Sequence, residues 1–356
     1  MWPDRRLCEL LKIEHPIIQA PMAGAATPEL ASAVCNAGGL GSLGSAEMTL
    51  PDVRTVAARM RAATNRPFNL NFFIAGTPKT DAAILQRTRE RLQPWYDALG
   101  LGVPPDTLPD LPPAFGDDHM ALLLEIRPAV VSFHFGMPDH AAIAALKAAG
   151  ITLISSATTV AEARALEASG MDAVIAQGLE AGGHRGSHTP RDPGEGVGTL
   201  ALVPQIADAV SVPVIAAGGI GDGRGIAAAF ALGAAGVQIG TGFLSCPEAG
   251  TDPARRALLR SATDTDTMVT NAFSGRPARA MRSRYAEEIA RSREPLPAFQ
   301  QMYALSGPIE AAAADDEASF HLYGQAAALN RELPAAELLR QLVAETAQAF
   351  GRVSTA

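Results

Sequence analysis

PVIAAGGIGDGRGIAAAFALGAAGVQIGTGF, residues 213–243, contains the pattern that decides the fold of this chain. Its two ends, PVIAAGG (213–219) and GVQIGT (236–241), are short apolar runs bounded by glycine, which is typical of buried strands. Between them, Asp222 precedes the Ala-rich segment GRGIAAAFALGA, as an N-cap residue precedes a helix. A strand, a helix and a second strand in this order predict a parallel strand pair with the helix packed across it.

The same unit recurs along most of the chain. Helix-start signals follow several of the strands, at Thr27-Pro28-Glu29, Pro51-Asp52 and Thr158-Thr159. Eight units allow the sheet to close, so the sequence predicts an α/β protein with a (β/α)8 or TIM barrel; an open, doubly wound sheet is the alternative. The six further candidate strands are IIQAPM (17–22), GLGSLG (39–44), FNLNFF (68–73), AVVSFHF (129–135), TLISSA (152–157) and AVIAQG (173–178).

Two segments do not follow the repeat. Residues 76–125 contain a charged helical run and a Pro-rich stretch, which indicates an insertion after the third strand. Residues 251–356 mix helix and loop and close with an amphipathic helix near 334–350. We therefore expect a barrel domain over residues 1–250 and a C-terminal helical lid region over 251–356, which packs across the barrel mouth and returns to the barrel.

Composition excludes several classes of function. The net charge is −8 and no basic stripe is present, which argues against a nucleic-acid partner. No long apolar run or secretory leader is present, so we expect a cytoplasmic protein without a membrane partner, as a monomer or homodimer. The spacing of Cys8, Cys35 and Cys246 fits neither a disulfide framework nor a metal cluster, so we expect buried thiols and no metal.

The ends of the predicted strands should carry the chemistry, because barrel active sites form there. Glycines follow strands seven and eight, at Gly218-Gly219 and in the run Gln238-Ile239-Gly240-Thr241, each with a helix start behind it. Backbone N–H groups that no side chain covers, together with a helix dipole, suit a phosphate group. The alternative is that these glycines only make tight turns.

Polar and soft side chains end three other strands. Asn71 and Gln177 carry amides that both donate and accept hydrogen bonds, which suits the edge of a flat heteroaromatic ring. They equally suit a role in satisfying loop backbone. Met22, after Ala20 and Pro21, is either an apolar platform under such a ring or a core residue.

Two histidines are candidates for the chemistry. His184 lies in the loop Gly-Gly-His-Arg-Gly, which is too rich in glycine to be core, and imidazole can transfer protons near neutral pH. His134 ends the fourth strand and is expected to face the same cavity. We predict His184 as the catalytic residue, with Arg185, His188 and Glu180 orienting its loop.

These motifs together resemble the nitronate monooxygenases, formerly called 2-nitropropane dioxygenases. The resemblance extends from about residue 12 to 350. The segments that carry it are QAPMAG (19–24), PFNLNFF (67–73), AQGLEAGGHRG (176–186), PVIAAGGIGDG (213–223), VQIGTGF (237–243), FSGRPAR (273–279) and GQAA (324–327).

The resemblance implies a non-covalently bound FMN, with its phosphate around Gly219 and Gly240-Thr241. It implies that Gly182 lets the loop close over the flavin and that His184 lies beside the ring, where it takes a proton from a neutral nitroalkane or holds the anionic nitronate. The expected flavin contacts are Ala20, Pro21, Met22, Asn71, Gln177, Gly182, Gly183, Gly218, Gly219, Gln238, Ile239, Gly240 and Thr241.

The implied reaction is the oxidation of alkyl nitronates, such as propionate 3-nitronate, by O2 to carbonyl compounds and nitrite. A lid tyrosine, Tyr303 or Tyr323, is expected near the substrate, and Phe299 departs from the tyrosines that similar members place there. Flavin-dependent enoyl-ACP reductases share an EAGGH-like loop, so an FMN-dependent NAD(P)H reductase of quinones or enoyl thioesters is the first alternative. A non-catalytic barrel that binds a phosphorylated ligand is the second.

Overall fold

Eight parallel strands form a closed barrel in this computed structural model, which describes residues 2–354 except 77, 78, 80, 109, 110, 112, 293, 315 and 316. The order is β1-β9-β8-β6-β5-β4-β3-β2, and a parallel bridge between Ile18 and Leu40 closes the ring. All eight predicted strands are confirmed. They are β1 (Ile17–Gln19), β2 (Gly41–Gly44), β3 (Phe68–Phe73), β4 (Val130–His134), β5 (Thr152–Ala157), β6 (Ala173–Gln177), β8 (Val214–Ala217) and β9 (Gly236–Ile239).

The predicted helix starts are confirmed by their caps. The side chains of Thr27, Thr159 and Asp222 accept hydrogen bonds from the first turns of α2, α7 and α9. The third helix begins one residue earlier than its signal, because Thr49 is the cap and Pro51 lies in the first turn. The helices around the barrel are α2 (Pro28–Asn36), α3 (Leu50–Ala63), α5 (Asp117–Ile126), α6 (His140–Ala148), α7 (Val160–Ser169), α8 (Thr199–Ala207), α9 (Gly223–Ala231) and α13 (Ala335–Ser354).

The core is built mainly from aliphatic side chains, as the composition indicates. One large cluster fills the layer between the sheet and the outer helices. A second cluster joins strand residues such as Ile18 and Ile215 to Leu7 and Leu11 of α1 (Arg6–Leu11). The three cysteines are buried and unpaired, as predicted.

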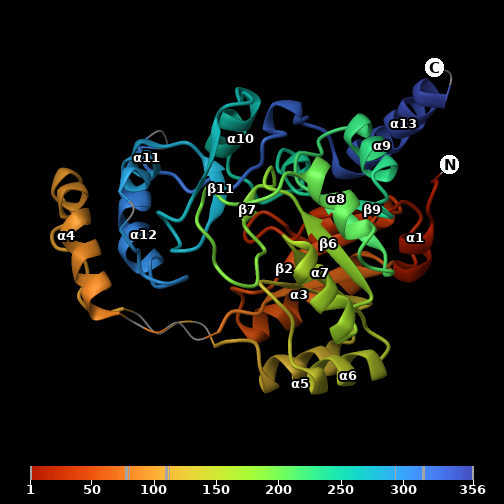
Figure 1. The fold of residues 1–356 in the computed structure, drawn as a ribbon, viewed down its shortest axis with the longest axis horizontal. Coiled ribbons are helices and arrows are strands. Elements are labelled where there is room, and N and C mark those ends of the chain that lie inside the picture. Colours follow the sequence, from red (N-terminus) through yellow and green to blue (C-terminus); the bar gives the residue numbers. More distant parts are fainter. Residues whose placement is uncertain are drawn as a thin grey trace.

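The segment after the third strand contains two different kinds of helix. α4 (Ala82–Ala98) packs with α11 (Arg284–Arg291) and α12 (Tyr303–Ala312) around a separate cluster that includes Trp95 and Tyr285. Figure 1 shows these three helices together at one end of the molecule. α5, by contrast, contacts α3 and α6 and belongs to the barrel, so only the first part of residues 76–125 departs from the repeat. Part of the Pro-rich stretch lies outside the described residues.

A small antiparallel sheet, which the sequence does not predict, joins the C-terminal region to the barrel mouth. Its order is β10 (Thr267–Thr270), β11 (Ala278–Met281) and β7 (Gly183–His184). Residues 183 and 184 are too few to show any periodicity, which is why sequence reasoning misses this strand.

The closing helix of the C-terminal region lies against the outer wall of the barrel. α13 packs on α9 and α2 at the outside of the barrel, and Figure 1 shows it beside α9. Its apolar residues Leu338, Leu339 and Leu342 are buried in the main core, because an amphipathic helix must cover its apolar stripe.

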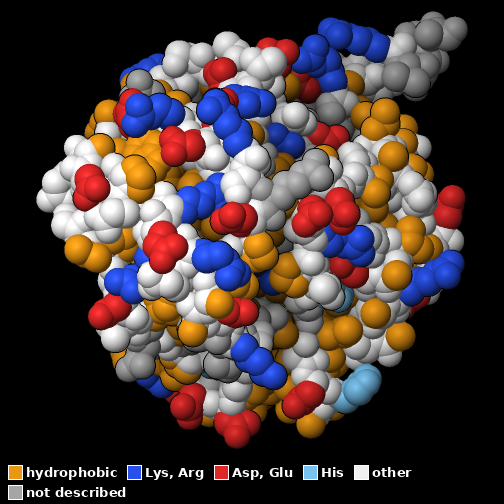
Figure 2. All heavy atoms as spheres, turned by 60° about the vertical axis from the view of Figure 1, so that its left-hand side comes forward, with side chains coloured by type: hydrophobic (Ala, Val, Ile, Leu, Met, Phe, Trp, Pro, Cys, Tyr) orange, Lys and Arg blue, Asp and Glu red, His pale blue; other side chains and the backbone are white. Residues whose placement is uncertain are grey.

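The surface carries charges of both signs. Figure 2 shows acidic and basic side chains interspersed on the face formed by the α4, α11 and α12 end of the molecule. Among the described residues, no helix is long and apolar enough to cross a bilayer. Within the same residues, no group of three or more histidine, cysteine, aspartate or glutamate side chains is arranged to hold a metal ion.

Candidate active site

The carboxyl ends of β1, β8 and β9 form an accessible rim. The strands themselves are largely buried, whereas residues 20–22, 218–219 and 240–241 are partly or fully exposed. The parallel register brings these ends together, since Gln19 pairs with Ile239 and Ala217 with Gln238. Expected flavin contacts from three separate segments therefore lie close together at one end of the barrel.

Three backbone N–H groups on this rim have no protein acceptor. Within the described part of the chain, the amides of Gly219, Gly240 and Thr241 donate no hydrogen bond. Gly240 has space above it, because a Cβ there would be no closer than 3.4 Å to Ala20 and 3.6 Å to the Met22 sulfur. A buried acceptor without a partner, Gln238 Oε1, lies on the same strand. Unpaired donors of this kind fit an oxyanion such as phosphate.

The start of α9 does not contribute to that cradle, contrary to expectation. Asp222 Oδ1 accepts hydrogen bonds from the Arg224 and Gly225 amides at 2.9 and 3.3 Å. The Gly223 amide donates to Glu345 Oε2 at 3.1 Å. Two carboxylates thus already occupy the helix N-terminus, and the dipole of α9 is directed at them.

The two predicted amides have unequal roles in the structure. Asn71 Nδ2 donates to Ser132, which leaves Oδ1 without a partner among the described residues. Gln177 holds the histidine loop, since its Nε2 donates to His184 O at 3.0 Å and its Oε1 accepts from Gly186 N at 2.7 Å. Asn71 therefore offers an acceptor to a ligand, whereas most of the capacity of Gln177 is used by loop backbone.

His184 lies in β7 and is 9% exposed. Its Nε2 lies 2.9 Å from Ser274 Oγ, and that hydroxyl donates to Arg276 O at 2.9 Å. Because the serine proton is committed to Arg276, His184 Nε2 carries a proton and Nδ1 has the lone pair. Four phenylalanines surround the imidazole. They are Phe299, Phe320, Phe135 and Phe73, with ring centroids 5.2, 5.8, 6.0 and 6.5 Å from that of His184.

This environment keeps the imidazole neutral. Burial, with smaller contributions from His134 and Arg276, lowers the pKa of His184 to about 3. The Arg276 guanidinium stacks on the Phe135 ring at 3.8 Å, and burial lowers its own pKa to about 10, so it remains a cation. A neutral His184 accepts a proton rather than presenting a positive charge to an anion.

His134 supports the loop from behind. Its Nε2 lies 3.1 Å from His184 O, so it donates there, and its Nδ1 accepts from Ser156 Oγ at 2.6 Å. Burial lowers the pKa of His134 to about 3. Both ring nitrogens are engaged by protein, which makes His134 a positioning residue in this structure rather than the expected substrate contact.

The expected lid tyrosines lie in different surroundings. The Tyr303 ring centroid is 6.3 Å from that of Phe299 and 6.1 Å from that of Phe320. Tyr303 therefore packs against two of the four phenylalanines that surround His184. Burial raises the pKa of Tyr303 well above its usual range. Tyr323 is only 1% exposed and packs in a small cluster that Met22 also contacts.

The close approach at Gly182 involves the C-terminal segment. A Cβ there would lie 2.5 Å from Gly324 N, so only glycine permits the contact. Gly324 N donates to Thr241 Oγ1 at 2.9 Å and Gln325 N to Glu180 O at 3.0 Å. The GQAA segment therefore ties the histidine loop to the end of β9. Gly183 has a positive φ of 79° with open space around it.

One expected residue and several unexpected ones hold the histidine loop in place. Arg185 was expected to orient it, and its Nη1 donates to Gly178 O at 2.6 Å. Arg279 acts similarly, with Nε donating to Leu179 O at 3.0 Å. Arg279, Arg276 and Ser274 all belong to the segment 273–279, whose resemblance to the family was the only signal that pointed to it.

Comparison with known proteins decides the family. A model of the nitronate monooxygenase family matches residues 4–345. The chain belongs to the nitronate monooxygenase family. The nitronate monooxygenase of Paraburkholderia phytofirmans is 48% identical over 353 residues, which cover 97% of this chain and 96% of the relative. That of Pseudomonas aeruginosa is 44% identical and covers 96% of this chain and 98% of its own.

A solved structure agrees with this assignment. Nitroalkane oxidase from Streptomyces ansochromogenes has a TM-score of 0.87 and 39% identity, over 98% of this chain and 99% of that one. The protein is therefore an oxidoreductase, and the family is flavin-dependent in general. The unpaired amides at 219, 240 and 241, the Asn71 acceptor and the open rim fit a phosphorylated flavin.

Proposed function

We propose that this protein is an FMN-dependent nitronate monooxygenase that converts alkyl nitronates and O2 into carbonyl compounds and nitrite. The observation that carries the proposal is the neutral, phenylalanine-walled His184 held at the mouth of the barrel, beside a rim of unpaired backbone amides. Electron transfer from the nitronate to oxygen is chemistry that a bound FMN supplies. The chain's own residues bind, orient and handle the proton.

The rim residues would hold the flavin. The amides of Gly219, Gly240 and Thr241 would meet the phosphate, and Asn71 Oδ1 would accept from the ring edge. Gln177 contributes mainly by fixing the backbone of the histidine loop. Fixed donors that need no rearrangement favour binding because little ordering entropy is lost.

His184 would act as a proton acceptor for a neutral nitroalkane. Its Nε2–H is held by Ser274, which directs the lone pair of Nδ1 away from that contact. Because its pKa is about 3, the imidazole is a weak base and proton abstraction is slow. A preformed nitronate needs no proton removal, so we expect nitronates to be much better substrates than nitroalkanes. The apolar walls exclude water from the reacting carbon.

The deciding experiment mixes the purified protein anaerobically with propionate 3-nitronate and, separately, with NADH while the flavin spectrum is recorded. Flavin reduction by the nitronate, with nitrite and carbonyl product released once oxygen is admitted, is the expected result. Reduction by NADH alone would replace the proposal with the nicotinamide-dependent reductase. A protein that takes up no flavin would point to the non-catalytic barrel.

A further inference from the structure

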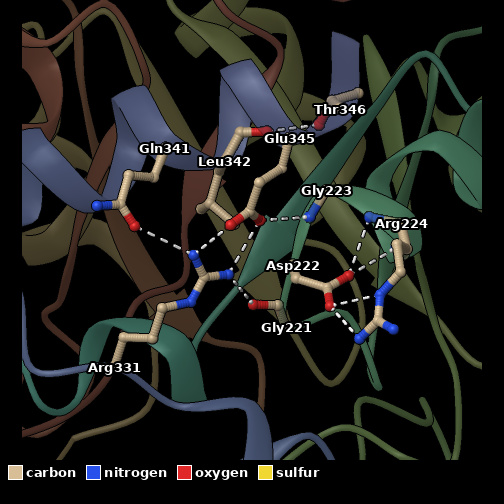
Figure 3. A network of polar contacts seen from close by, with 10 residues as sticks. Gly221, Asp222, Gly223, Arg224, Arg331, Gln341, Leu342, Glu345 and Thr346 are labelled. Carbon is tan, nitrogen blue, oxygen red and sulfur yellow. Dashed lines mark hydrogen bonds and ion pairs between the residues drawn. The ribbon is translucent and has the colours of Figure 1, made fainter. Parts of the chain in front are cut away.

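The C-terminal helix α13 contacts the β8–α9 loop (residues 218–223) from outside the barrel. Glu345 of α13 accepts a hydrogen bond from Gly223 N at 3.1 Å. Its carboxylate also pairs with Arg331, with Oε1 2.6 Å from Nη1 and Oε2 3.0 Å from Nη2. Arg331 Nη2 lies 3.5 Å from Gly221 O as well. Figure 3 shows this clasp, in which Glu345 and Arg331 converge on the loop.

The contact requires a glycine at position 223. A Cβ there would collide with the backbone of Glu345 and Thr346, so α13 could not keep its place. Gly225 lies two residues further along the same helix, and a Cβ there would come no closer than 3.4 Å to Ile220, which is ordinary contact. Gly225 therefore faces Ile220 and not α13, whereas Gly223 is in direct contact with the backbone of α13.

Residues 329–331 also connect the segment after β9, which begins with Gly240 and Thr241, to the Glu345–Arg331 contact. Asn330 Nδ2 donates to Ser245 Oγ at 2.6 Å, just after η1 (Thr241–Phe243). The Leu329 side chain packs on Gly221, where a Cβ would lie 2.8 Å from it. Both loops that present unpaired amides are thus fixed to one C-terminal strap. A hollow of about 500 Å³ borders the clasp and is lined in part by Arg224, Leu329 and Glu345.

We propose that this clasp, formed by Arg331, Glu345 and the Gly223 amide, sets the affinity of the protein for the phosphate group of its flavin. The inference rests on the proposed function, which assigns the phosphate to the amides of Gly219, Gly240 and Thr241. Those donors bind well only if the loops are already in place, because ordering them on binding costs free energy. Glu345 and Arg331 are positioning residues, since neither is assigned a contact with the flavin.

A purely electrostatic effect of Glu345 on FMN affinity would have the opposite sign to a positioning effect, so a substitution of Glu345 can distinguish the two. A phosphate is an anion, so Glu345 acting only as a nearby negative charge would weaken its binding. Neutralising Glu345 would then tighten FMN binding. If the clasp positions the loop, neutralising Glu345 weakens FMN binding instead.

The first test uses two charge-neutral substitutions in one helix. Gly223→Ala and the matched control Gly225→Ala are titrated as flavin-free proteins with FMN and with riboflavin, which lacks the phosphate, by flavin fluorescence. Gly223→Ala is expected to weaken FMN binding about tenfold and leave riboflavin binding unchanged, while Gly225→Ala matches the wild type. A general folding defect would weaken both ligands.

The second test changes the ion pair. Glu345→Gln is compared with Glu332→Gln, which breaks the exposed Arg260–Glu332 pair in the same C-terminal segment. We expect weaker FMN binding and faster amide hydrogen exchange over residues 218–226 for the first variant only. Hydrogen exchange reports on the loop without any flavin, so it remains informative if a variant binds none.

Four outcomes would overturn the inference. Equal loss of FMN and riboflavin affinity in Gly223→Ala would assign the contact to general stability. Tighter FMN binding by Glu345→Gln would leave only a charge effect. A wild-type protein that binds neither flavin would overturn the inference together with the proposed function, whereas wild-type binding with unaltered variants would overturn the inference alone.

Discussion

The two sides of the candidate site are built in different ways. On one side, residues 218–223 and 240–241 directly follow the neighbouring strands β8 and β9, and their glycines follow from the local βα pattern. On the other side, His184 is fixed by Ser274, which lies 90 positions later, and by His134, 50 positions earlier. The phosphate side is local in sequence and the histidine side is assembled from distant segments. Substitutions on the phosphate side should therefore change FMN affinity, whereas substitutions on the histidine side should change the rate of turnover.

The largest effect is expected for His184→Asn. The substitution should lower kcat/KM for 3-nitropropionate about 100-fold or more, because a proton acceptor is lost, and should lower it much less for propionate 3-nitronate. Steady-state kinetics with both substrates and a flavin spectrum of the variant check this. His140→Asn, at the exposed start of α6, is the control. Equal losses on the two substrates would contradict the proton-acceptor role.

Gly240→Ala tests the phosphate side. Its Cβ would make only ordinary contacts with Ala20 and Met22, so the flavin-free protein should unfold at the wild-type temperature. The methyl group would occupy the space beside the unpaired amide of residue 240, and FMN affinity should fall about tenfold. Thermal unfolding and flavin titration measure the two effects. A lowered melting temperature without a change in affinity would show that Gly240 serves only the turn.

Ser274→Ala tests the histidine side at a distance from the chemistry. Without the hydroxyl, His184 Nε2 loses its acceptor and the ring is no longer fixed, so kcat should fall about tenfold while FMN affinity stays unchanged. Ser274→Thr keeps a hydroxyl and should restore most of the activity. Ser261→Ala, at the exposed end of α10 (Pro253–Arg260), serves as the control. Loss of flavin by Ser274→Ala would show that the two sides are not separable.

The smallest effect concerns pH. Burial lowers the pKa of His184 and His134 to about 3, so in the folded protein both stay neutral where an unfolded chain, with histidine pKa near 6.5, takes up protons. The unfolded state therefore binds more protons between about pH 3 and 6.5, and stability must fall as pH drops through that range. Thermal unfolding from pH 7 to 4.5 should show this decline. It should be shallower in His134→Asn, and an unaltered slope would contradict the neutral state of that residue.

Local patterns were sufficient for the barrel and for half of the site. Apolar runs, caps and glycines predict the eight strands and the rim at 218–219 and 240–241, because each of these features involves residues close in sequence. They do not predict that α5 belongs to the barrel or that α13 lies outside it. Those outcomes depend on which surface the apolar face of each helix packs against, and several exposed apolar surfaces of the barrel could accept such a helix.

The sequence by itself determined the eight strands, the glycine-rich rim and, through its motifs, the family. The tertiary structure decided that the sheet closes into a barrel and that His184 is buried in β7. Only the tertiary structure decided that His184 is neutral and that His134 supports it. It also decided that the Gln177 side chain hydrogen-bonds to the backbone of the histidine loop. In the same way, the first backbone amides of α9 donate to the carboxylates of Asp222 and Glu345. The physical reason is that burial, proton position and hydrogen-bond capacity are set by neighbours from distant segments, which no local pattern records.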